Sequence, residues 1–185
     1  MRIVGGRFRG RALHGPRSDA IRPTADRLRE AVFNVLAHAL GDPCEGARVI
    51  DLFAGTGALG LEAISRGASF CLFVDQGADA RAAVRANVEA LGLGDVTRLF
   101  RRDATKLGDA PPGPRFTLAF LDPPYGLGLA GPALAALADG GWLEPGALCV
   151  VEEAAEATVQ WPPAIGPLDR RTYGDTQVAF GRVAG

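Results

Sequence analysis

Histidine and cysteine are scarce in this chain. Its 185 residues include two histidines, His14 and His38, and three cysteines, Cys44, Cys71 and Cys149. Both sets are widely spaced along the sequence, so neither supplies the clustered ligands of a zinc-type site. Two of the cysteines lie in apolar runs, where a thiol packs as a small hydrophobe. We therefore expect no disulfide framework and no metal site.

The chain also lacks a long apolar run. Hydrophobic residues make up 48% of the sequence, yet no stretch approaches the roughly 20 consecutive apolar residues that cross a bilayer. The first residues contain no apolar signal segment. The length fits one domain with a sizeable core. We predict a soluble, cytoplasmic protein with no membrane partner and expect a monomer, although the sequence does not fix the oligomeric state.

Lysine is nearly absent, because Lys106 is the only one, and the positive charge is carried by arginine. Residues 1–30 hold eight arginines against three acidic residues, whereas the rest of the chain is net negative. Arginine binds phosphate through a planar fork of donors. This asymmetry is typical of a nucleic-acid contact, although a merely solvated segment would have the same composition.

From residue 24 onward, helical and strand-like patterns alternate. Leu28, Val32, Leu36 and Leu40 recur at helical spacing, with Thr24 able to cap the helix. Strands are predicted at residues 47–53, 69–75, 96–101, 116–122 and 147–152, and further helices at 58–66, 78–91 and 132–138. Residues 170–173 and 177–183 predict a hairpin. The sequence therefore predicts an α/β fold, with a basic arm at residues 1–23 and a Rossmann-like domain at residues 24–185.

A glycine-rich segment follows the first predicted strand. Gly55, Gly57 and Gly60 satisfy the dinucleotide fingerprint, and Asp75 lies near the spacing of a ribose-binding acid. Asp51 argues for another ligand, because a carboxylate there would repel a pyrophosphate but would suit the ammonium and sulfonium of S-adenosylmethionine. Asp103 could accept the adenine amine. The alternative for Asp75 and Asp103 is that they are ordinary acids at strand ends.

A second motif, Asp122-Pro123-Pro124-Tyr125, follows a buried strand. The lone pair of an exocyclic base amine is delocalised into the ring, so the amine needs help to attack a methyl group. The Asp122 carboxylate and the Pro123 carbonyl can hold its two protons, and consecutive prolines fix the backbone in advance. Tyr125 can stack on a base that has left its neighbours. Asp-Pro-Pro alone could be only a turn.

At these residues the chain resembles the bacterial 16S ribosomal RNA guanine-N2-methyltransferases. Beside the Asp122 motif, the resemblance rests on these segments: Arg2 to Gly6, Arg9 to Arg11, Arg22 to Thr24, Asp26-Arg27, Arg29-Glu30, Phe33 to Leu36, Asp51 to Arg66, residues 141–143, Glu152 and residues 173–176. Phe8 stands where that family often has a larger aromatic residue, and Asp75 where it often has Glu. The resemblance implies a class I methyltransferase fold with a seven-stranded, mostly parallel sheet, helices on both faces and a C-terminal antiparallel hairpin.

The resemblance also implies the partners and the site. The methyl donor is S-adenosylmethionine, and the substrate is small-subunit ribosomal RNA within a partly assembled subunit. The predicted catalytic residues are Asp122, Pro123, Pro124 and Tyr125. The predicted cofactor contacts are Asp51, Phe53, Ala54, Gly55, Thr56, Gly57, Asp75, Gln76, Asp103 and Ala104. The predicted RNA contacts are Arg7, Arg9, Arg11, Arg22, Thr24, Arg27 and Arg29.

Other functions share parts of this pattern. An adenine-N6 methyltransferase acting on DNA or RNA would use the same amine geometry, although the chain has no large target-recognition domain. A glutamine methyltransferase acting on release factors usually has Asn where Asp122 stands. Asp51 argues against an NAD-dependent oxidoreductase, because its carboxylate would repel the pyrophosphate. A noncatalytic RNA-binding protein would not bind S-adenosylmethionine, although the predicted residues form a complete pocket for it.

Overall fold

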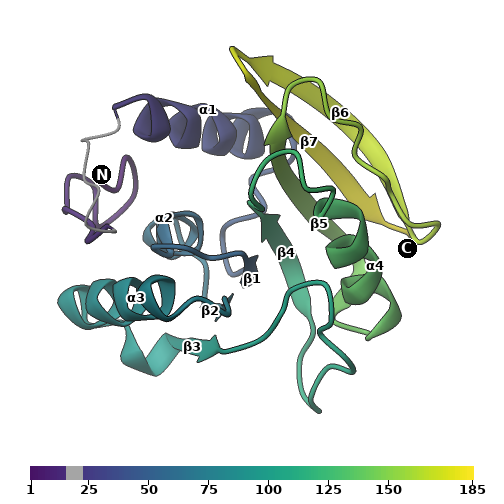
Figure 1. The fold of residues 1–185 in the computed structure, drawn as a ribbon. Helices are drawn as coiled ribbons and strands as arrows, with labels where there is room; N and C mark the ends of the chain where they lie inside the picture. Colours follow the sequence, from purple (N-terminus) through teal and green to yellow (C-terminus); the bar gives the residue numbers. More distant parts are fainter. Residues whose placement is uncertain (16–22) are drawn as a thin grey trace.

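Seven strands form one twisted sheet in the computed structural model, which describes residues 1–15 and 23–185 (Figure 1). The strand order is β3-β2-β1-β4-β5-β7-β6. The first five strands pair in parallel, and β7 pairs antiparallel with both β5 and β6. The expected sheet, mostly parallel with a C-terminal antiparallel hairpin, is therefore confirmed.

The elements run in the order that the sequence predicts. The strands are β1 (Arg48–Leu52), β2 (Phe70–Val74), β3 (Thr97–Phe100), β4 (Phe116–Leu121), β5 (Leu143–Ala154), β6 (Ile165–Tyr173) and β7 (Thr176–Val183). The α-helices are α1 (Pro23–Ala39), α2 (Ala58–Ser65), α3 (Ala78–Leu91) and α4 (Ala130–Asp139), and a short 3₁₀ helix, η1, spans Gly94–Val96.

Several boundaries differ from the prediction. Strand β5 begins at Leu143 and not at residue 147, because Pro145 and Gly146 lie at an irregularity of the strand and do not end it. Strand β6 begins at Ile165 rather than residue 170, on the outer edge of the sheet, where Pro167 can be tolerated. Helix α1 begins at Pro23, so Thr24 lies within its first turn and does not precede it as a cap.

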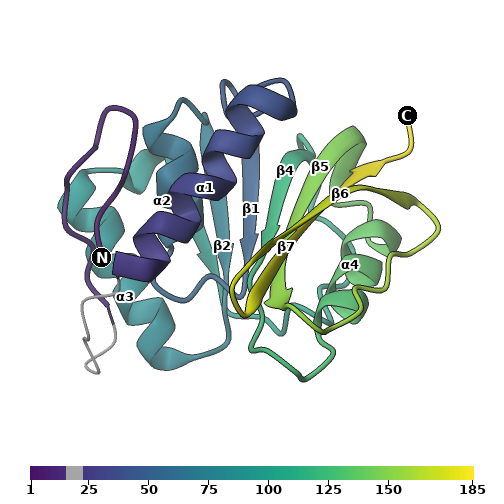
Figure 2. The same cartoon turned by 90° about the horizontal axis from the view of Figure 1, so that it is seen from above.

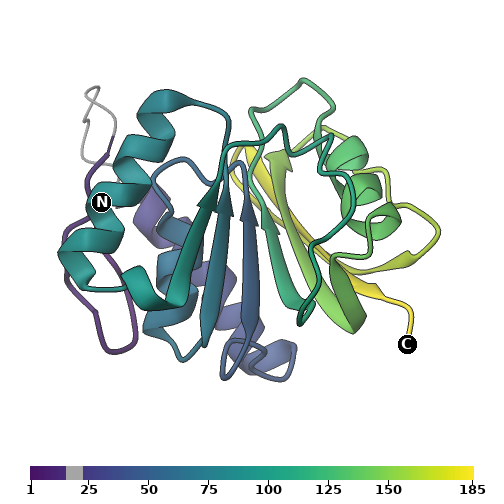
Figure 3. The ribbon, with the colours of Figure 1, turned by 90° about the horizontal axis from the view of Figure 1, so that it is seen from below.

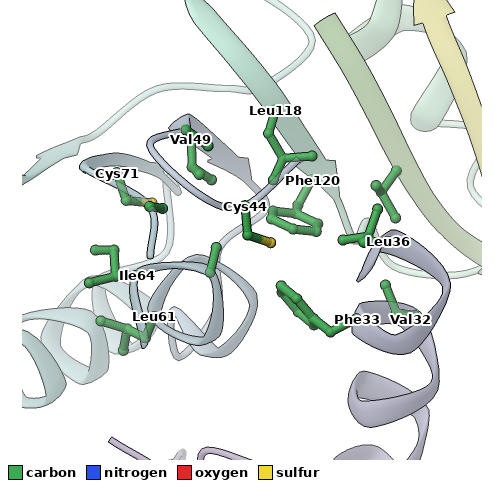
Figure 4. Close-up of a cluster of buried hydrophobic side chains, with 14 of the residues drawn as sticks. Val32, Phe33, Leu36, Cys44, Val49, Leu61, Ile64, Cys71, Leu118 and Phe120 are labelled. Atoms are coloured by element: carbon green, nitrogen blue, oxygen red, sulfur yellow. The ribbon is translucent and has the colours of Figure 1, made fainter. Parts of the chain in front are cut away.

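Helices cover both faces of the sheet. Helices α1, α2 and α3 lie on one face and α4 on the other (Figures 1–3). Because side chains alternate along a strand, Val49 points toward the three-helix side and Ile50 toward α4. Figure 4 shows the hydrophobic core between the sheet and the three helices, where Phe33 of α1 lies against Phe120 of β4 with ring centroids 5.5 Å apart.

Residues 1–15 fold back on α2 and α3. An isolated bridge between Arg2 and Ala12 closes a small loop. The buried Glu62 carboxylate of α2 accepts hydrogen bonds from the backbone N–H groups of Val4 and Gly5, both at 2.9 Å. Asn87 of α3 binds both the N–H and the carbonyl of His14. The described part of the basic arm is therefore attached to the domain surface, and a domain boundary at residue 23 stays a prediction.

Candidate active site

A large pocket opens at the carboxyl ends of the parallel strands. Its volume is about 1050 Å³. It is lined by residues at or after the carboxyl ends of β1 to β4, by Glu152 near the end of β5 and by the apolar face of α1. Ligands of open α/β sheets bind at this edge, and the pocket is large for a single small molecule. It therefore has room for a cofactor and for part of a second substrate.

The glycine-rich loop forms one wall of the pocket. Gly57 has a left-handed φ of 81° where it precedes α2, and Gly55 has a φ of 59°. A Cβ on Gly55 would meet nothing within 4 Å, so its backbone is open to a ligand. A Cβ on Gly60 would lie 2.5 Å from the Cys71 sulfur, so this glycine lets α2 pack closely on β2. Phe53 has a φ of 56°, which is uncommon for a residue with a side chain.

Asp51 lies beneath this loop, in β1. Its side chain is 1% exposed, and its Oδ2 accepts the N–H of Gly60 at 3.0 Å. Burial raises the pKa of the Asp51 carboxyl to about 8, although the Gly60 hydrogen bond opposes this shift. The shift means that the buried site favours the protonated form of this carboxyl, and a cation nearby would favour the charged form.

Asp75 and Asp103 differ in how they relate to the pocket. Asp75 lines it, and its two oxygens accept the backbone N–H groups of Gly55 at 3.0 Å and Gly77 at 2.8 Å. Asp103 does not line it, because its Oδ1 accepts both the backbone N–H and the hydroxyl of Thr105. These bonds lower the pKa of Asp103. Its position gives no support to the predicted contact with an adenine amine.

The Asp122 motif lines the same pocket as the glycine-rich loop and follows the strand next to β1. The N–H of Asp122 donates to the carbonyl of Leu52 at 3.4 Å, which continues the pairing of β4 with β1 beyond the strand end. Asp122, Pro123, Pro124 and Tyr125 all line the pocket. Burial, and next the neighbouring Glu152, raise the pKa of Asp122 well above its usual value.

Tyr125 is held by two strands of the hairpin side of the sheet. Its hydroxyl donates to Glu152 Oε1 at 2.7 Å and lies 2.9 Å from Thr176 Oγ1. Buried Glu153 accepts the N–H of Gly126 at 3.1 Å and so fixes the next residue of the turn. Although Tyr125 is 42% exposed, its ring is therefore restrained at the rim of the pocket.

The predicted cofactor residues are largely brought together. All of them line the pocket except Gly57 and Asp103. Sequence reasoning missed other residues that line the pocket, among them Met1, Leu28, Val32, Arg102, Leu129 and Glu152. Leu28 and Val32 were expected only to pack on the sheet, and a periodic pattern cannot tell an apolar face that meets a pocket from one that meets a core.

The predicted RNA contacts fall into three groups. Arg7, Arg9, Arg11 and Arg27 are exposed. Arg22 and the side chain of Thr24 lie outside the described residues. Arg29 is 5% exposed, and its guanidinium donates to Glu62 at 3.2 Å, to Asp26 at 2.8 Å and to the carbonyl of Arg2. Two nitrogens of this guanidinium are therefore bound inside the protein, and Arg29 also lines the pocket. The phosphate contact of Arg29 stays a prediction.

Two features of the described residues bear on other classes of site. In residues 1–15 and 23–185, no group of three or more His, Cys, Asp or Glu side chains is arranged to hold a metal ion. Within the same ranges, no helix is long and apolar enough to cross a membrane.

Comparison with known proteins places the chain in a family. The family model described as "Conserved hypothetical protein 95" matches residues 1–182. The chain belongs to this family. Among its relatives, ribosomal RNA small subunit methyltransferase D of Escherichia coli is 37% identical over 97% of this chain and 87% of that protein. The YlbH protein of Bacillus subtilis is 35% identical over 97% of both chains.

Solved structures agree with this assignment. The yhhF protein of Escherichia coli superposes with a TM-score of 0.83 and 29% identity, over all of this chain and 98% of that one. Haemophilus influenzae HI0767 superposes with a TM-score of 0.80 and 27% identity, over 100% and 98%. Both superpositions cover the whole of this chain, so these two proteins share its overall fold.

Proposed function

We propose that the protein transfers a methyl group from S-adenosylmethionine to the 2-amino group of a guanine in small-subunit (16S) ribosomal RNA. The observation that carries this proposal is that the Asp-Pro-Pro-Tyr corner and the glycine-rich loop line one pocket. The name of the Escherichia coli relative supports the same class of substrate. Action on ribosomal RNA would place the protein in the cytoplasm, on naked RNA or on a partly assembled subunit.

The residues of the pocket suit this cofactor. Asp51, Asp75 and Asp122 give the pocket an acidic lining, and the Gly55 backbone is open. Asp51 would favour the positive charge of the ligand, and Asp75 would accept its ribose hydroxyls. When bound, the cofactor would supply an electrophilic methyl group on a positively charged sulfur.

The chain would act on the amine by holding it. The Asp122 carboxylate and the Pro123 carbonyl would accept its two N–H groups, which turns the nitrogen lone pair toward the methyl carbon. The nitrogen would gain a bond to the methyl carbon as the carbon–sulfur bond breaks and the sulfur leaves as a neutral thioether, and the nitrogen must then lose one proton. A carboxyl whose pKa is raised, as that of Asp122 is, suits the acceptance of this proton. Tyr125 would stack on the flipped base.

The decisive experiment is to map methylated bases in ribosomal RNA from cells with and without the protein. We expect one N2-methylguanine in small-subunit RNA to disappear and to return when the wild-type gene, but not the Asp122→Ala variant, is supplied. Loss of an N6-methyladenine instead would contradict the proposal. Titration calorimetry should show binding of S-adenosylmethionine and none of NAD, which would separate the proposal from an oxidoreductase.

A further inference from the structure

Two carboxylates from neighbouring strands stand side by side in the pocket. Leu121 of β4 pairs with Val151 of β5, so the next residues, Asp122 and Glu152, are adjacent across the sheet. Both line the pocket. The influence of Glu152 on the pKa of Asp122 is further support for their proximity.

Glu152 is also hydrogen-bonded to Tyr125, the residue that would stack on the base. The Tyr125 hydroxyl donates to Glu152 Oε1, and Thr176 on β7 lies on the other side of that hydroxyl. A carboxylate has two oxygens and about four acceptor positions. Glu152 can therefore restrain Tyr125 and still accept a hydrogen bond from a base that stacks on it.

The edges of the bases differ at the position beside the amine. In guanine the ring nitrogen N1, next to the 2-amino group, carries a hydrogen and is a donor. In adenine and cytosine the ring nitrogen next to the amine on the Watson–Crick side is a bare acceptor. A carboxylate at that position would accept the guanine N1–H and would repel the lone pair of the other two bases.

We propose that Glu152 is the residue that selects guanine, by accepting the N1–H while Asp122 and the Pro123 carbonyl hold the 2-amino group. This inference rests on the proposed function and names the side chain that reads the base. It assigns different tasks to the two carboxylates: Asp122 orients the reacting nitrogen, and Glu152 recognises its neighbour. A pocket with Asp122 alone would grip any exocyclic amine.

Base analogues test this assignment directly. Target RNA is prepared with guanine, 2-aminopurine or 2,6-diaminopurine at the methylated position, since both analogues keep the 2-amino group but have an unprotonated N1. For the wild-type protein we expect kcat/KM to be about 100-fold or more lower on the analogues, because sites built to bind an N–H reject ligands that lack it. In Glu152→Gln, kcat/KM on guanine should fall. The ratio of kcat/KM on guanine to kcat/KM on the analogues should decrease at least about tenfold, because the amide can donate to a bare N1.

A matched variant separates selection from the positioning of Tyr125. Thr176→Val removes the other partner of the Tyr125 hydroxyl and leaves Glu152 in place. It should lower kcat/KM on guanine and on the analogues by the same factor, so the ratio stays that of the wild type. Should Glu152→Gln fail to fold, Glu152→Asp keeps the charge with a shorter reach and should also reduce the ratio.

The outcomes distinguish this inference from the proposed function. If the wild-type protein methylates guanine but Glu152→Gln, or Glu152→Asp in its place, keeps the wild-type ratio, Glu152 does not select the base. The same conclusion follows if the wild-type protein accepts 2-aminopurine as readily as guanine. If the wild-type protein methylates no guanine in any small-subunit RNA, the proposed function itself is wrong.

Discussion

At the scale of single residues, the carboxyl groups of the pocket combine burial with charge. Asp51 and Asp122 both have raised pKa values because little water reaches them, yet the proposed ligand is a cation. A buried carboxyl costs stability in its charged form, and this cost is offset only when a positive group arrives. The buried carboxyl groups thus favour binding of a cation but lower the stability of the unliganded protein.

Replacing Asp122 tests its role in orienting the amine. Asp122→Ala should remove about 3 kcal/mol or more of transition-state stabilisation, by analogy with the loss of one preorganised polar group. Asp122→Asn keeps an oxygen acceptor at the same place and should retain more activity than the alanine variant. Single-turnover kinetics would give both values, and calorimetry should show cofactor affinity nearly unchanged. A large loss of affinity with an intact methyl-transfer rate would contradict this role.

Replacing Asp51 should make the unliganded protein more stable than the wild type, by an amount that grows as the pH rises. The folded pKa of about 8 lies above the ordinary value of 3.8, so between these values the native state binds a proton that the unfolded chain lacks. Stability is therefore lost as the pH rises through this window. Asp51→Asn removes this pH dependence and can keep the bond to Gly60. The stability advantage of the variant over the wild-type protein should therefore grow by about 3 to 4 kcal/mol between pH 5 and pH 8.

Denaturant titrations at several pH values would measure this difference. The same variant should bind S-adenosylmethionine more weakly at pH 8, because the negative charge is gone. An advantage that does not change with pH would show that Asp51 is charged throughout the window.

At the scale of elements, α2 connects the basic arm to the pocket. The loop that precedes α2 lines the pocket. On the helix itself, Glu62 accepts hydrogen bonds from two backbone N–H groups of the arm and forms ion pairs with Arg29 and Arg66. Asn87 on α3 adds a second connection, since it binds both His14 and the carbonyl of Thr56. The arm is thereby held on the three-helix side of the molecule, where its exposed arginines can meet RNA.

Removing charge from the arm should weaken RNA binding. Replacing Arg7, Arg9 and Arg11 by Gln should lower the affinity and reduce the salt slope of log K by about one unit for each phosphate that the arm no longer binds. Filter binding at several salt concentrations would measure this slope. The exposed Arg171 and Arg182, on the hairpin, provide a matched control whose replacement should change it less. An unchanged slope in the triple variant would mean that these three arginines are solvated and bind no phosphate.

At the scale of the whole molecule, the parallel sheet brings distant acids to one edge. Asp51, Asp75, Asp122 and Glu152 come from separate segments, and the strand order places all four around a single opening. Such an acidic opening is a property of the fold and of no single element, and it attracts cationic ligands.

Binding of the cationic cofactor should therefore release protons. A cation lowers the pKa of Asp51 from about 8, so at pH 7 the carboxyl should give up its proton as the ligand enters. Calorimetry at pH 7 in two buffers with different ionisation enthalpies would show a net release of up to about one proton from this group. The Asp51→Asn variant should release fewer. No release from the wild-type protein would mean that Asp51 is already charged.

The sequence by itself determined the order of the elements and the two motifs. Helical periodicity located α1 and α3, buried apolar runs located β1, β2 and β4, and the acids at the strand ends marked the edge that carries the pocket. These signals are local, because they depend on the backbone period and on turns formed by neighbouring residues.

Only the tertiary structure decided which polar groups face the pocket. Asp103, expected to contact the cofactor, turns back to Thr105. Arg29, expected to contact RNA, is bound to Glu62 of a distant helix and lines the pocket instead. Glu152 carried no motif of its own and enters the site only because β5 pairs in register with β4. The direction of a side chain depends on contacts between segments far apart in the chain, and no local pattern contains that information.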